Sequence, residues 1–190
     1  MNSNFVLIVI CFVIVLVSYF FCHSKKDWRY LVIAMGFTLL SDYFLLIANN
    51  YRVGVFTFCF VHITYIIRIS KNRFKSIVYI LATFTGGLLL VLFVDDILVA
   101  LAAVYAALFV QNLITNFCQN HPRLPLANRR LMLTGLVLFA LCDINVLLFN
   151  LPNFIYFPQS IAGISHSLIW WFYAPAQILL AFSAFNFRKA

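Results

Sequence analysis

Charged residues are scarce in this chain, and their scarcity excludes an ordinary soluble domain. Of its 190 residues, 9% are charged and 65% are hydrophobic, and the mean hydropathy is +1.01. The apolar runs are about 20 residues long, which is the length that spans the hydrocarbon core of a bilayer. Backbone groups in lipid must be satisfied within the chain, so these runs are expected to be helices. The sequence therefore predicts an all-α, polytopic membrane protein in which residues 1–190 form a single integral membrane domain.

The motifs of common enzyme classes are also missing. The chain has no G-x-S-x-G nucleophile motif, no P-loop, no Rossmann glycine pattern and no H-E-x-x-H. Its five cysteines have no metal-ligand spacing and fall mostly in apolar runs, which argues against a disulfide framework and a cysteine zinc site. No basic residue precedes the first apolar run and no small-residue cleavage site follows it, so residues 5–22 are expected to remain as a helix.

Seven apolar spans are present, and the basic residues between them predict how they cross the membrane. The expected helices cover residues 5–22, 29–48, 53–70, 74–94, 97–117, 130–150 and 160–185. Twelve of the thirteen basic residues fall in alternate loops or at the chain end, on one side: Lys25, Lys26, Arg29, Arg68, Lys71, Arg73, Lys75, Arg123, Arg129, Arg130, Arg188 and Lys189. Because basic loops remain in the cytoplasm, we expect the N-terminus outside and the C-terminus in the cytoplasm. This distribution explains the net charge of +8, and we expect no nucleic acid partner.

Two aspartates, Asp42 and Asp143, lie inside apolar spans. An aspartate at the centre of a membrane helix costs roughly 2.5 to 3.5 kcal/mol, so it usually faces the bundle interior and has a function. Residues 37–49 resemble residues 138–150 at an offset of 101, which matches the two aspartates with each other. Their helices run in the same direction, so both carboxyl groups are expected at one depth, in the outer half of the membrane. An internal repeat or a chance match between leucine-rich segments explains this similarity.

Polar residues recur at helical spacing on five of the seven expected spans. They predict a shared interior cavity lined by the second, third, fifth, sixth and seventh spans, with the first and fourth outside it. The candidate substrate-binding or supporting residues are Thr38, Ser41, His62, Tyr65, Tyr105, Asn112, His166, Tyr173 and Gln177. The alternative is structural, because such residues also form hydrogen bonds between neighbouring membrane helices.

The aspartate pair predicts acid–base chemistry. Two carboxyl groups close together in a low-dielectric interior do not both ionise, which leaves an acid beside a base. Hydrolysis of an acid-labile ether needs such a pair. One aspartate would protonate the substrate to an oxocarbenium-like cation, and the other would stabilise the cation and activate water. Aspartate and histidine are also metal ligands, but their spacing here is not that of a metal site, and we expect neither a metal nor another cofactor.

Four motifs follow one another along the chain: Thr38-x-x-Ser41-Asp42, Gly54-x-x-x-Phe58-x-x-x-His62-x-x-Tyr65, Gly135-x-x-x-Phe139-x-x-Cys142-Asp143 and Tyr173-Ala-Pro-Ala176-Gln177. In this order they resemble the motifs of the lysoplasmalogenase-like (YhhN-type) family of membrane proteins, over about residues 36–183. The chain departs from the family pattern at three positions, with Thr38, Ser41 and Cys142 in place of serine, glycine and serine. It also has seven expected helices, whereas the family usually has eight.

The resemblance implies a hydrolase that cleaves the vinyl ether bond of lysoplasmalogens to a fatty aldehyde and a glycerophospho-alcohol. It implies catalytic roles for Asp42 and Asp143 and a lipid substrate taken from the bilayer. We expect a multi-pass protein of the cell (plasma) membrane. Two alternatives remain at this point. One is a small seven-helix transporter built from two three-helix repeats around the fourth helix. The other is a catalytically inactive homologue that binds lipid.

Overall fold

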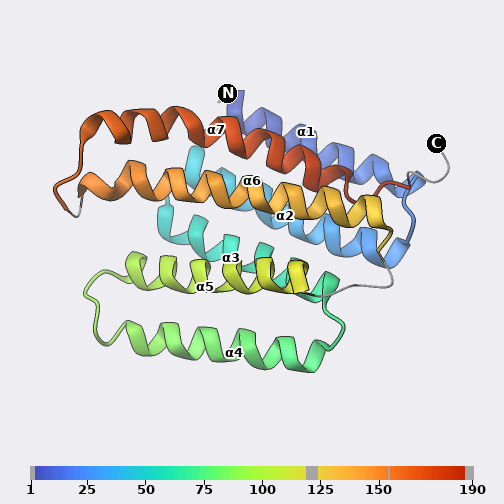
Figure 1. Ribbon diagram of the computed structural model, residues 1–190, viewed down its shortest axis with the longest axis horizontal. Helices are drawn as coiled ribbons and strands as arrows, with labels where there is room; N and C mark the ends of the chain where they lie inside the picture. Colours follow the sequence, from blue (N-terminus) through green and yellow to red (C-terminus); the bar gives the residue numbers. More distant parts are fainter. Residues whose placement is uncertain (1–2, 119–123, 154, 187–190) are drawn as a thin grey trace.

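The computed structural model describes residues 3–118, 124–153 and 155–186. Within these residues the chain forms seven α-helices and two short 3-10 helices and contains no β-strand (Figure 1). Their bounds are α1 Ser3–Val17, η1 Ser18–Phe20, α2 Lys25–Leu46, α3 Tyr51–Ile69, α4 Arg73–Leu90, α5 Ile97–Cys118, α6 Leu126–Asn150, η2 Leu151–Asn153 and α7 Gln159–Phe182. The prediction of seven helices is confirmed over the described residues, and the ends lie close to those expected.

Length and apolar composition make this a multi-pass membrane protein. Five helices, α2 to α6, are long and apolar enough to cross a membrane. The first helix, with η1, is a shorter apolar helix, and α7 has 24 residues with several polar ones in its first half. Large apolar side chains also cover the outside of the bundle, including Phe74, Leu81 and Trp171, each more than half exposed. Lipid is the solvent in which such a surface is stable.

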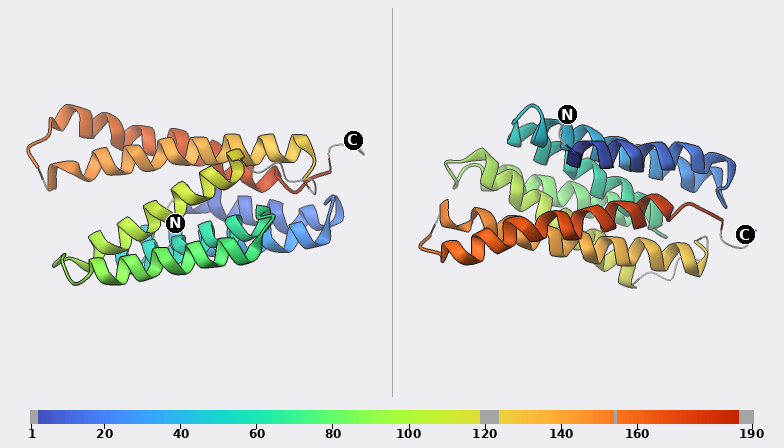
Figure 2. Two further views of the ribbon diagram at one scale, coloured as in Figure 1. Left: turned by 60° about the horizontal axis from the view of Figure 1, so that its bottom comes forward. Right: turned by 90° about the horizontal axis from the view of Figure 1, so that it is seen from above.

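The helices pack mainly as two hairpins, α2 with α3 and α6 with α7 (Figures 1 and 2). The α1 helix lies against α2 and α7, and its buried face is apolar, with Ile8 and Val15 fully buried. The α4 helix lies at the edge of the bundle and contacts chiefly α5. We call the end at which α2, α4 and α6 begin the basic end, and the opposite end the far end.

In each hairpin one glycine allows the two helices to pack closely. A Cβ atom at Gly54 of α3 would lie against the Leu45 side chain of α2, and one at Gly135 of α6 would lie 3.1 Å from the Ala176 carbonyl oxygen of α7. Small residues at such crossings let membrane helices approach each other. Helices α2 and α6 begin 101 residues apart, so each interior aspartate stands 17 residues after the first residue of its helix. Both helices run from the basic end toward the far end (Figure 1).

A buried ion pair joins three helices at the basic end. The Arg68 guanidinium donates two hydrogen bonds of 2.7 Å to the Asp27 carboxylate of α2. It also donates to the Ser183 hydroxyl, just after α7, at 2.9 Å, and Asn128 of α6 donates to the Ser183 carbonyl at 2.8 Å.

This network corrects one assignment made from the sequence. Arg68 is not a loop cation but lies in the last turn of α3, where it is 5% exposed and paired with Asp27. An arginine so placed can be buried because a carboxylate neutralises it. Arg123, Arg188 and Lys189, which contribute to the predicted orientation, lie outside the described residues.

Candidate functional site

The first interior carboxyl group is bonded to a tyrosine of another helix. Asp42 of α2 is 4% exposed, and its Oδ2 accepts a hydrogen bond of 2.5 Å from the hydroxyl of Tyr173 on α7. Tyr173 is itself buried. Across the described part of the chain, no Lys, Arg or His lies within ion-pair distance of this carboxyl group. Its bonded partner is therefore a neutral phenol and not a cation.

The second interior carboxyl group repeats this arrangement on a different pair of helices. Asp143 of α6 accepts a hydrogen bond of 2.6 Å at Oδ2 from the hydroxyl of Tyr105 on α5. Both side chains are half-buried. The ion pairs found among the described residues again leave this carboxyl group without a cation. Each of the two carboxylates thus keeps one oxygen bonded to a phenol from a neighbouring helix.

Aromatic rings connect the two aspartate–tyrosine pairs. The Phe139 ring of α6 lies 5.5 Å from the Tyr173 ring and 5.8 Å from the Phe58 ring, between centroids. The Phe58 ring of α3 in turn lies 6.0 Å from the Tyr105 ring. The pairs are therefore neighbours separated by apolar surface, where charges interact more strongly than in water.

His62 lies beside the second pair and is fully buried on α3. Its ring centroid is 5.0 Å from that of Tyr105, and its Nδ1 is 3.3 Å from the side-chain nitrogen of Asn112 on α5. Asn116 donates to the Asn112 Oδ1 at 3.0 Å, which fixes the amide so that its nitrogen faces the histidine. The amide nitrogen is the donor, so Nδ1 accepts and the ring proton belongs on Nε2. That Nε2 is buried and has no hydrogen-bond partner among the described residues.

Gln177 lies one helical turn beyond Tyr173 on α7 and is also fully buried. Neither its amide nitrogen nor its amide oxygen has a partner within the described part of the chain. A buried polar group left without a partner costs about 1 to 3 kcal/mol. Gln177 and His62 therefore supply three buried polar atoms that are available to a ligand or to water.

The comparison with protein-family models matches residues 5–184 to the YhhN family. The chain belongs to the YhhN family. The match contains all four motifs noted in the sequence and confirms the resemblance drawn from them. No curated protein and no solved structure matches the chain.

Three of the predicted supporting residues in this YhhN protein bond elsewhere. Thr38 donates to the Ala34 carbonyl of its own helix at 3.1 Å. Ser41 donates to the Thr57 hydroxyl at 2.7 Å and so joins α2 to α3. The Tyr65 hydroxyl lies 3.8 Å from the Met35 sulfur, within the buried apolar core. These contacts are those of helix packing, and none of them reaches a carboxyl group.

The structure does not bring His166 to the carboxyl groups. Its side chain is exposed, and its ring packs against Phe149 at 4.7 Å. Helical spacing puts it on the same face of α7 as Tyr173, as expected. However, the far end of the α6–α7 hairpin extends beyond the α2–α3 turn, so neither of these two helices covers α7 at that level (Figures 1 and 2).

Metal-ligating side chains are not grouped in the described part of this YhhN protein. Over residues 3–118, 124–153 and 155–186, no three or more His, Cys, Asp or Glu side chains lie close enough to hold a metal ion. His62 and His166, the histidines that the sequence put forward as possible ligands, differ sharply in burial and in surroundings.

The pairing of each aspartate with a tyrosine was not foreseen from the sequence. A signal for one pair does exist in the helix register. Tyr105 lies eight residues after α5 begins at the far end, and Asp143 lies seven residues before α6 ends there. Counting residues from the far end therefore places Tyr105 and Asp143 at about the same depth. The bond from Tyr173 to Asp42 has no such signal, because α7 extends farther than α2.

Proposed function

We propose that this YhhN protein is a membrane-embedded hydrolase that cleaves the vinyl ether bond of lysoplasmalogens, with a fatty aldehyde and a glycerophospho-alcohol as products. The proposal is carried by one observation: two interior carboxyl groups are each bonded to a neutral phenol, and contacting aromatic rings link the two phenols. Membership of the YhhN family supports it. A single-chain lipid would place its apolar chain against the rings and its acid-labile bond between the carboxyl groups.

Vinyl ether cleavage begins with protonation of carbon. One protonated aspartate gives its proton to the double-bond carbon farther from oxygen, and the π electrons form the new C–H bond. This leaves an oxocarbenium cation. The other carboxylate takes a proton from water as the water oxygen adds to the cationic carbon. The resulting hemiacetal then breaks its bond to the glycerol oxygen as the second aspartate, now protonated, gives that oxygen a proton. The first aspartate, now a carboxylate, takes the proton of the hemiacetal hydroxyl as the aldehyde forms. Both aspartates return to their starting states, and the net reaction consumes one water.

The neighbours of the carboxyl groups suit this sequence. The Tyr173 and Tyr105 hydroxyls hold one oxygen of each carboxyl group and leave the other for proton transfer. Attraction between a carboxylate and the cation is strong where aromatic rings such as Phe139 exclude water. The unpartnered Nε2 of His62 and the amide of Gln177 would bind the attacking water.

The depth of the site indicates how the lipid would lie. Asp42 stands four residues before α2 ends, which is about 6 Å along the helix axis. The vinyl ether of a lysoplasmalogen adjoins the glycerol, so the headgroup would lie at the far end. If basic loops remain in the cytoplasm, the far end faces outward. The proposed orientation therefore has the N-terminus outside and the substrate headgroup in the outer leaflet, and the membrane we propose is the plasma membrane.

The test is aldehyde release from a lysoplasmalogen by the purified protein. Asp42→Asn and Asp143→Asn should each lower the rate by at least about 100-fold, the smaller end of the usual contribution of an acid or base. Asp95→Asn, which changes an exposed aspartate in the far-end loop, is the matched control and should keep the rate. A folded wild type that releases no aldehyde from any of several headgroup types would refute the hydrolase and favour a transporter or an inactive lipid-binding homologue.

A further inference from the structure

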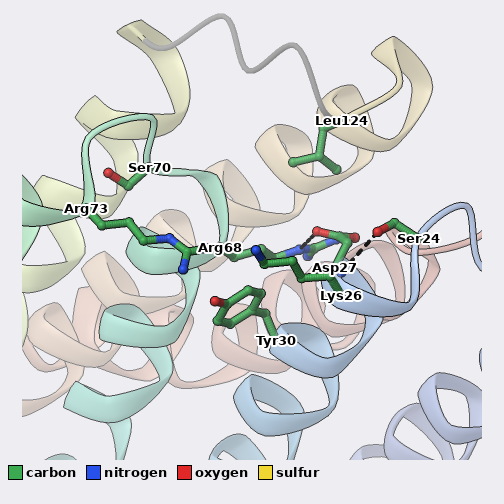
Figure 3. A pocket seen from close by; sticks show the side chains of 8 residues that line it. All are labelled: Ser24, Lys26, Asp27, Tyr30, Arg68, Ser70, Arg73 and Leu124. Carbon is green, nitrogen blue, oxygen red and sulfur yellow. Dashed lines mark hydrogen bonds and ion pairs between the residues drawn. The ribbon is translucent and has the colours of Figure 1, made fainter.

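A hollow opens at the basic end of the bundle, away from the interior aspartates (Figure 3). It lies where α2 begins, α3 ends and α4 begins, and Leu124, just before α6, also lines it. The residues that line it are Ser24, Lys26, Asp27, Tyr30, Arg68, Ser70, Arg73 and Leu124. Three of these eight side chains are cationic and one is anionic, so the lining carries a net positive charge.

The single negative charge is already neutralised. Both carboxylate oxygens of Asp27 accept hydrogen bonds from the buried Arg68 guanidinium, at 2.7 Å each. Lys26 and Arg73 are the remaining cations of the lining. Among the ion pairs of the described residues, neither one has a carboxylate partner. The hollow therefore contains two cations without an anion.

These two cations converge on the same space. Figure 3 shows the Lys26 and Arg73 side chains extending toward each other from opposite sides of the hollow, above the Tyr30 ring. The Arg73 guanidinium carbon lies 5.6 Å from the centroid of that ring, a cation–π contact that holds it in place. Two like charges directed at one point repel each other unless an anion lies between them. Arginine and lysine together favour a phosphate oxyanion in such a position.

We propose that this hollow binds a phosphate group, with Lys26 and Arg73 as its cationic ligands and the Tyr30 hydroxyl as a further donor. At this end of the bundle the phosphate belongs to a phospholipid headgroup or to a soluble phosphate. Basic side chains at a membrane surface attract anionic lipids, by about 1 kcal/mol for each residue.

This phosphate cannot be that of a lipid being cleaved at the aspartates. Asp27 and Asp42 are 15 residues apart on the same helix, which corresponds to about 22 Å. The phosphate and the vinyl ether of one lysoplasmalogen are separated only by the glycerol carbons. The hollow is thus a second site, and its existence does not depend on the proposed hydrolase activity.

The experiment measures binding to the purified full chain in a neutral detergent. One arm titrates phosphatidylglycerol, a second titrates inorganic phosphate, and phosphatidylcholine serves as a zwitterionic reference. The variant Lys26→Gln/Arg73→Gln removes both ligands. The matched control Lys75→Gln/Arg130→Gln removes one lysine and one arginine that are exposed at the basic end but do not line the hollow. All four positions are exposed, and the folding of each variant is checked by its thermal unfolding without lipid.

We expect the first double variant to weaken phosphatidylglycerol binding by about tenfold or more, and the control double variant to leave it within about twofold. If inorganic phosphate shows the same dependence on Lys26 and Arg73, the site takes a soluble phosphate as well, and if only the lipid does, its source is the headgroup. Equal losses in both double variants, or a wild type that binds neither probe more tightly than it binds phosphatidylcholine, would overturn the proposal.

Discussion

Carboxyl groups are buried in two regions of this molecule, and their partners differ. At the basic end, Asp27 is held by the Arg68 guanidinium through two hydrogen bonds of 2.7 Å. Toward the far end, the hydrogen bonds that Asp42 and Asp143 accept from described residues come from tyrosine hydroxyls. A carboxylate paired with a buried cation has a permanent charge and acts as a structural link. A carboxyl group with a neutral partner is free to exchange a proton, which is what an acid or a base requires.

Removing the charge at the basic end tests the structural half of this comparison and should have the largest effect on stability. Asp27→Asn leaves the Arg68 guanidinium buried without a counter-charge. We expect the free energy of unfolding to fall by about 3 kcal/mol or more, measured by denaturant titration in detergent micelles. Asp95→Asn should leave it unchanged. Aldehyde release per folded molecule should survive in both variants, and a loss of activity at full stability in Asp27→Asn would contradict the division between the two regions.

Removing the phenol partners tests the chemical half. Tyr105→Phe and Tyr173→Phe each delete one hydrogen bond to an interior carboxyl group and keep the aromatic ring. Such bonds contribute about 1.5 to 3 kcal/mol, so we expect aldehyde release to fall at least about tenfold in each variant. Tyr65→Phe is the matched control, because its buried hydroxyl faces the Met35 sulfur and no carboxyl group. An equal loss in all three variants would indicate a general packing effect in place of a role at the carboxyl groups.

The two regions also show which features can be predicted from the sequence and which cannot. Apolar length and the alternation of basic loops predict seven helices, and the 101-residue offset predicts the shared register of Asp42 and Asp143, because both depend on spacing along the chain. Contacts between helices depend on rotation and relative height, which spacing within one helix does not determine. The sequence therefore predicts Arg68 as a loop cation and contains no signal for the bond between Tyr173 and Asp42.

His166 is the converse case, a residue that the sequence places at the site and the structure does not. Its spacing places it on the same helical face as Tyr173, but it is exposed, because α6 and α7 extend beyond α2 and α3 at the far end (Figures 1 and 2). The relative lengths of neighbouring hairpins decide whether a residue on the right face is covered, and the sequence of one helix contains no measure of them.

Asp143 and Tyr173 lie on α6 and α7, so the close packing of these two helices sets their relative positions. Loosening that packing should have a smaller effect on stability. A methyl group at Gly135 would lie 2.9 Å from the Leu180 Cγ and 3.1 Å from the Ala176 carbonyl oxygen. We expect Gly135→Ala to lower the free energy of unfolding by about 1 to 3 kcal/mol, since the backbone of α7 must move away. Gly163→Ala is the control on the same hairpin, where a Cβ meets nothing within 4 Å. Equal unfolding of both variants would mean that the contact at Gly135 is not close in solution.

Substitution of His166 should have the smallest effect on aldehyde release, and its comparison with His62 tests how far the site extends along the bundle. His166 is exposed and its ring packs against Phe149, so His166→Ala should change aldehyde release by less than about twofold, as surface substitutions usually do. His62→Ala removes a buried donor whose ring centroid lies 5.0 Å from that of Tyr105, and it should reduce the rate strongly. His62→Gln, which keeps a donor, should recover part of it if that donor binds substrate or water. A strong loss in His166→Ala would extend the site to the far end of the α6–α7 hairpin. In that case the headgroup would lie against the first turns of α7, between His166 and the aspartates.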